Sequence, residues 1–117
     1  MSFTSTTDIR DVHHGPGAMT AILWAFIQAK GAFEVKVSIG IEIGHSDKVQ
    51  VLVIIGDTKA IFTPDELREG AERIIEKLPD ARRFGASERD VADLRGLAEV
   101  LIRNADTAAT VSPHGLH

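Results

Sequence analysis

Apolar and polar residues alternate strictly between residues 33 and 43 of this 117-residue chain. The apolar ones stand at the odd positions: Phe33, Val35, Val37, Ile39, Ile41 and Ile43. A period of two is typical of a strand with one face buried and the other in water. After the turn formers at 44–48, the same parity resumes in Val49, Val51, Val53 and Ile55. The sequence therefore predicts an antiparallel hairpin with one β-branched face, which the rest of the chain must cover.

The two apolar sets also predict the register of this hairpin. Pairing Ile43 with Val49 brings every odd position to one face, and the even positions of the second strand to the other. A second tight turn predicts a third strand over residues 58–62, which places Ile61 beside Leu52. The second face of the sheet then carries Leu52, Ile54 and Ile61, and it needs a cover of its own.

A helix is predicted over residues 18–29, ahead of the hairpin. It is apolar on nearly every side and ends at Lys30-Gly31, a cation followed by glycine, which is typical of a helix end. A helix of this kind has to be buried on more than one side. In so small a protein, that requirement favours either a sandwiched position or a partner subunit.

Two amphipathic helices are predicted after the sheet. Thr63, Pro64 and Glu66 provide a capping box, and the helix they start is expected to end at Leu78, before Pro79. A loop over residues 79–86 leads to the last helix, which begins at Ser87 and runs to about Arg103, where Asn104 can end it.

These elements predict an α+β fold: a helix, a three-stranded antiparallel meander, and two helices packed on the sheet. We expect a flexible arm at 1–14, a single domain at 15–104 and a disordered tail at 105–117. The element order resembles that of double-stranded RNA-binding domains and of small nucleoid-associated proteins. Asp65 and Glu66 stand where such RNA-binding domains begin their final helix with lysines, so no site is carried over from that resemblance.

Composition narrows the function classes. The chain has no cysteine, which excludes disulfides and thiolate metal sites, and its net charge is −4 without a block of five like charges. Nonspecific binding to nucleic acid or anionic lipid is therefore disfavoured. The most apolar segment, 18–29, is shorter than the roughly 20 residues that cross a bilayer. We expect a cytoplasmic protein without a cofactor.

Residue types that could carry chemistry occur in patterns that ordinary structure explains. His13 and His14 are adjacent, so they point apart on an extended segment and make a poor metal site. The His-Ser-Asp run at 45–47 is typical of a turn, because a hydrolytic triad is assembled from separate elements. The carboxylates Asp57, Asp65, Glu66 and Glu69 could form a cluster, although the helical ones are expected to complement a helix dipole. We predict no catalytic, cofactor-binding or metal-binding residue.

Two sets of residues are candidates for contact with other molecules. The first is an expected subunit interface formed by Trp24, Phe26, Leu52, Ile54 and Ile61. The second lies in the predicted loop, where two guanidinium groups and an aromatic ring could hold an anion or a protein partner: Arg82, Arg83 and Phe84. The alternative for Phe84 is a ring tucked under that loop.

Three hypotheses on function follow. The first is a non-enzymatic, self-associating interaction or regulatory module of a bacterium or phage, which forms a homodimer through the first helix and the second sheet face. The second is a nucleic-acid-binding accessory protein that uses Arg82 and Arg83 with the lysines of the sheet, Lys36 and Lys59. The third is a small-ligand-binding protein or enzyme with an acid-base pair drawn from Asp57, His45 and Glu42.

Overall fold

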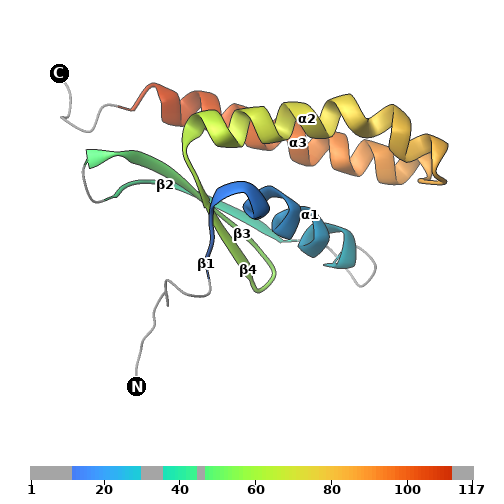
Figure 1. Ribbon diagram of the computed structural model, residues 1–117, viewed down its shortest axis with the longest axis horizontal. Helices are drawn as coiled ribbons and strands as arrows, with labels where there is room; N and C mark the ends of the chain where they lie inside the picture. The colour runs from blue at the N-terminus through green and yellow to red at the C-terminus, as the bar shows by residue number, and fades with distance from the viewer. Residues whose placement is uncertain (1–11, 30–35, 45–46, 112–117) are drawn as a thin grey trace.

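The predicted hairpin forms one end of a four-stranded sheet that three helices cover on one face (Figure 1). The computed structural model describes residues 12–29, 36–44 and 47–111. In chain order the elements are β1 (Val12–His13), the short 3₁₀ helix η2 (Gly15–Gly17), α1 (Ala18–Ala29), β2 (Val37–Ile43), β3 (Val49–Ile55), β4 (Thr58–Phe62), α2 (Pro64–Arg83) and α3 (Glu88–Ala109). The α+β class is confirmed. Among the described residues, no helix is both long and apolar enough to span a membrane.

The predicted register of the three antiparallel strands is confirmed. Ile43 pairs with Val49, and the ladder continues without a bulge to the pair of Val37 and Ile55. On the other side of β3, Leu52 pairs with Ile61. The alternation of apolar and polar residues was sufficient to predict this register, since a shift of one residue in the pairing would move all the apolar side chains to the solvent face.

The prediction of a three-stranded sheet was wrong by one strand. Val12 and His13 form β1, which pairs in parallel with β4 opposite Lys59 and Ala60 and gives the strand order β1-β4-β3-β2. Val12 is buried. These two residues had been assigned to the flexible arm because two residues are too few to show a period. The rest of that arm, 1–11, and the predicted strand start at 33–35 lie outside the described residues.

The core occupies one side of the sheet only. Its sheet contribution is the face formed by the odd positions of β3 with alternate positions of β4, all of them buried: Val51, Val53, Ile55, Ala60 and Phe62. All three helices contact this sheet: α1 packs on β4 and β3, α2 on the same two strands, and α3 on β3 and β2. The opposite face carries no helix in the described part of the chain (Figure 1).

Helix α1 is buried on one side, not on several. Ala18, Ile22 and Phe26 face the core, whereas Trp24 and Ile27 remain 59% and 47% exposed. The expectation of a sandwiched helix was therefore wrong within a single chain. The hydrophobicity of α1 exceeds what its contacts with the sheet require.

Helix α2 begins as predicted and ends later. The capping box is formed: the Glu66 amide donates to Thr63 Oγ1 at 3.1 Å, and the Thr63 amide donates to Glu66 Oε1 at 2.9 Å. The helix continues through Pro79 to Arg83. It ends where Gly85 takes a φ of +101° and donates to the Arg82 carbonyl, a geometry that glycine adopts without strain. The predicted loop over 79–86 is thus mostly helix.

Helix α3 also runs past its predicted end. Asn104 does not terminate it: the residue is helical, and its side-chain amide donates to the Val100 carbonyl one turn back. Ala105 and Ala108 are buried and continue the apolar stripe of Ala98 and Leu101. The first part of the predicted tail therefore belongs to the core, and 112–117 lies outside the described residues.

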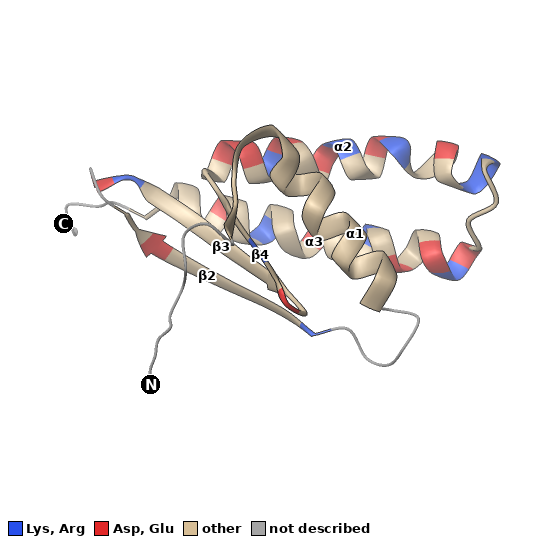
Figure 2. Ribbon diagram, turned by 60° about the horizontal axis from the view of Figure 1, so that its bottom comes forward, with Lys and Arg blue, Asp and Glu red and all other residues tan. Residues whose placement is uncertain are grey.

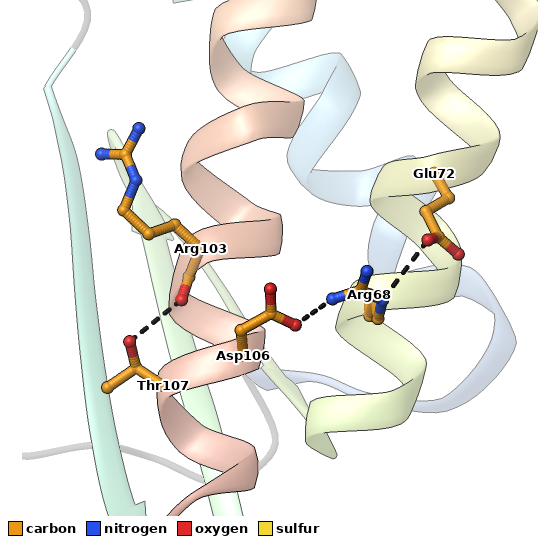
Figure 3. Close-up of polar contacts among 5 residues, drawn as sticks. All are labelled: Arg68, Glu72, Arg103, Asp106 and Thr107. Carbon is orange, nitrogen blue, oxygen red and sulfur yellow. Dashed lines mark hydrogen bonds and ion pairs between the residues drawn. The ribbon is translucent and has the colours of Figure 1, made fainter.

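An ion pair joins the start of α2 to the end of α3 (Figure 3). Arg68 contacts Asp106 across the two helices and Glu72 on its own helix, with 3.3 Å between Arg68 Nε and Glu72 Oε2. The hydrogen bond and charge of Asp106 raise the pKa of the Arg68 guanidinium. All three side chains are largely exposed, so this contact adds little to the stability of the fold.

The position of Ala105 gives a direct test of the C-terminal half of α3. Ala105→Glu should lower the free energy of unfolding by about 3 kcal/mol or more, because it forces a carboxylate into a packed apolar site. Thr107→Glu, two residues on and exposed, is the matched control and should change stability by no more than about 0.5 kcal/mol. Chemical denaturation followed by circular dichroism measures both. Equal, small effects of the two substitutions would mean that this turn does not pack on the core.

Candidate functional site

A groove lies between α1 and the second half of α2 in the helical layer. Its volume is about 310 Å³ and it is open to solvent. Apolar side chains of three helices and one residue of η2 line it, among them Met19, Leu23, Ile27, Ile74, Leu78 and Leu94. Figure 1 shows why it opens there: α1 and α2 diverge toward the tip of the α2–α3 hairpin.

One end of this groove lies where Met19 of α1 packs on Gly70 of α2. A methyl group added at Gly70 would meet the flexible end of the Met19 side chain, which can move aside, so the two helices could still approach each other with an alanine there. Farther along, Leu23 and Ile27 line the same side of α1 as Met19, because they follow it at intervals of four residues. They face Ile74 and Leu78 across a gap that no described residue fills.

The charge of the groove has one sign. Arg73 and Lys77 are the only charged residues among those that line it, and they stand four residues apart on α2, one turn from each other. Within the described part of the chain, neither takes part in an ion pair. Helix α1, the other wall, carries no charged residue (Figure 2).

The predicted interface residues lie in three different environments. Trp24 is exposed on α1, three residues before Ile27 of the groove, whereas Phe26 is only 8% exposed and belongs to the core. Leu52, Ile54 and Ile61 occupy the sheet face opposite the helices and are half-buried. Phe26 is thus a packing residue, and the five residues do not form one surface.

The edge of the sheet at β2 is a surface that the sequence reasoning missed. In the described sheet, β2 pairs with β3 on one side only. The Gly44 amide donates to the Lys48 carbonyl at 2.8 Å, which makes these residues a hydrogen-bonded pair. Since such pairs alternate along an antiparallel ladder, the even residues of β2 bond to β3. The amides and carbonyls of Val37, Ile39 and Ile41 point to the free edge.

The predicted anion contact lies at the tip of the α2–α3 hairpin. Phe84 is 89% exposed, so the alternative of a ring tucked under the loop is wrong. Arg82 and Arg83 form the last turn of α2 rather than a loop. Arg82 Nη2 lies 3.7 Å from Glu88 Oε1, and Arg83 Nη2 lies 3.7 Å from Asp80 Oδ1, so neighbouring carboxylates partly neutralise both.

The cations proposed for nucleic-acid binding do not converge. Lys59 pairs with Ile54 and belongs to the outer sheet face, and Lys36 precedes β2 at the edge of the sheet. The two arginines lie at the far end of the helical hairpin (Figure 2). No single face presents all four.

The candidate acid-base residues are also separated. Glu42 pairs with Gln50 near one end of β3, whereas Asp57 lies in the turn beyond its other end, more than about 17 Å away along the strand. His45 and Ser46 lie outside the described residues. His13 and His14 are exposed, and no group of three or more His, Asp or Glu side chains within the described residues is arranged to hold a metal.

Comparison with known proteins gave no match to a protein-family model, to a curated protein or to a solved structure.

The contrast between the two aromatic residues of α1 can be measured. Phe26→Ala should destabilise the protein by about 3–5 kcal/mol, because it empties a core site. Trp24→Ala should cost less than about 1 kcal/mol, since most of its ring is already in water. Denaturant titration of both variants decides the matter. A large loss of stability for Trp24→Ala would show that its ring is part of the fold rather than available for contact.

Proposed function

We propose that this protein is a non-enzymatic interaction module that works as a symmetric dimer, joined through the free edge of β2. The observation that carries the proposal is the seven-residue edge strand whose outward-pointing backbone groups have no strand partner in the described sheet. A long edge with neither proline nor bulge is a template for pairing with another strand. Within β2 the only charged side chain is Glu42, near its end.

The charges at the two ends of this strand favour one register. Two copies of β2 related by a two-fold axis at Ile39 would pair antiparallel, with Val37 opposite Ile41 of the partner subunit. The outward backbone groups of Val37, Ile39 and Ile41 would then exchange hydrogen bonds. On the outer face, the Lys36 side chain would lie opposite the carboxylate of the partner's Glu42, and the reciprocal pair would form by symmetry.

This interface differs from the one that the sequence suggested. It uses the edge of the sheet rather than α1 and the face with Leu52, Ile54 and Ile61. Its apolar part is the half-buried row of Val37, Ile39 and Ile41, which already packs beside the core. Pairing would extend that row into the second subunit, so that the two cores become continuous.

Reversing the charges tests both the dimer and its register. Lys36→Glu or Glu42→Lys should each weaken the dimer by about tenfold, because each creates two like-charge pairs across the axis. The double substitution Lys36→Glu/Glu42→Lys restores opposite charges and should restore the wild-type dissociation constant. Sedimentation equilibrium over a range of micromolar concentrations measures all three.

Lys59→Glu is the matched control, since it reverses a lysine on the same sheet face but away from the β2 edge. It should leave the dimer unchanged. A wild-type protein that stays monomeric at the highest concentration, or single substitutions without effect on the dimer, would contradict the proposal. A double variant as weak as the single ones would contradict the register.

A further inference from the structure

We infer that the groove between α1 and α2 binds an amphipathic helix with acidic flanks from a partner protein. This inference is independent of the proposed dimer, because no β2 residue lines the groove. Its three supports are the shape of the groove, its apolar floor and the sign of its rim charges.

The dimensions of the groove fit a short helix. Its lining residues extend from Pro16 to Ile27 along η2 and α1 and from Gly70 to Ala81 along α2. Eleven or so residues at about 1.5 Å each give a length of roughly 16 Å, which matches three helical turns. A helix seated there would pack against both walls and the Leu94 floor, as amphipathic helices do in apolar grooves.

Without a partner helix, two large apolar side chains of α1 are in contact with water. Ile27, which lines the groove, is 47% exposed. Trp24 is not among the lining residues, but it precedes Ile27 by three residues on the same helix and is 59% exposed. Large aromatic and aliphatic side chains around a pocket are the usual anchors of protein contacts. Two or three leucines on one face of a partner helix would fill the hollow and remove these side chains from water.

The charges of the groove determine which polar residues a partner helix would carry beside its apolar face. Arg73 and Lys77 both line the groove and are exposed, and long cationic side chains of this kind keep their aliphatic stems on apolar surface and their charged ends in water. Because no carboxylate lines the groove, the two cations would attract Glu or Asp side chains spaced one turn apart on the incoming helix. An anionic membrane could use the same charges, but the lining residues of three helices form a concave groove, which fits a helix better than a flat lipid surface.

The 117-residue chain contains a single tryptophan, Trp24, whose emission can report on binding near Ile27. The probe is a designed 14-residue helical peptide, about the length of the groove with one extra turn, with leucines on one face, glutamates beside them and no tryptophan. The matched peptide carries lysines in place of the glutamates. The acidic peptide should shift Trp24 emission to shorter wavelength and bind with micromolar affinity, and the basic peptide should bind at least about tenfold more weakly.

Variants assign this binding to the groove. Arg73→Glu/Lys77→Glu should reverse the preference between the two peptides, whereas Arg82→Glu/Arg83→Glu, at the hairpin tip, should leave it unchanged. Ile27→Asp should abolish binding without unfolding the protein, since its side chain is about half exposed. The Lys36→Glu variant should bind the acidic peptide as the wild type does, which separates this inference from the proposed dimer.

Several results would overturn the inference. Equal affinity for the two peptides would remove the charge argument, and no binding of either at millimolar concentration would remove the groove as a helix site. Peptide binding that occurs only as the dimer dissociates would show that a second copy occupies the groove. A shift of Trp24 emission with anionic phospholipid vesicles but not with the acidic peptide would assign the surface to a membrane.

Discussion

The structure depends on one constraint: the sheet has a single strongly apolar face, and all three helices pack against it. The odd positions of β2 and β3 place their β-branched side chains on that face, and Val51, Val53 and Ile55 are fully buried there. Because the helices cover only this face, the other face, the β2 edge and the outer side of α1 have no cover in the described part of the chain. The candidate contact surfaces are therefore consequences of how the core is built.

The sequence was sufficient to predict the central sheet and the helix starts. Strand register follows from parity, so Ile43 opposite Val49 and Leu52 opposite Ile61 could be assigned without a structure. The capping residues Thr63 and Ser87 act through hydrogen bonds within three residues of chain, at 3.1 Å in both cases. Signals of this kind are local, and the packing around them does not change them.

The ends of α2 and α3 and the short strand β1 were not predicted, because the sequence signals for them are weak or come from residues far away in the chain. Pro79 was expected to end α2, yet the better stop signal lies six residues later, where Arg82 and Arg83 precede Gly85. Burial against the other elements of the core carries α3 past Asn104, because Ala105 and Ala108 fit close to them where larger side chains would not. The groove could not be predicted, since it depends on the angle between α1 and α2. The excess hydrophobicity of α1 was its one visible trace in the sequence.

We thus expect two contacts on two different surfaces. A second copy of the chain would pair with the backbone groups along β2, and a partner helix would pack on the apolar side chains between α1 and α2. The dimer is the more basic claim, and amide hydrogen exchange resolved by residue tests it most directly. The even residues of β2, such as Gly40, bond to β3 and should be protected at any concentration. The account predicts that the amides of Ile39 and Ile41, which point to the free edge, become equally protected as protein concentration rises. Fast exchange at Ile39 and Ile41 at every concentration, beside a protected Gly40, would contradict it.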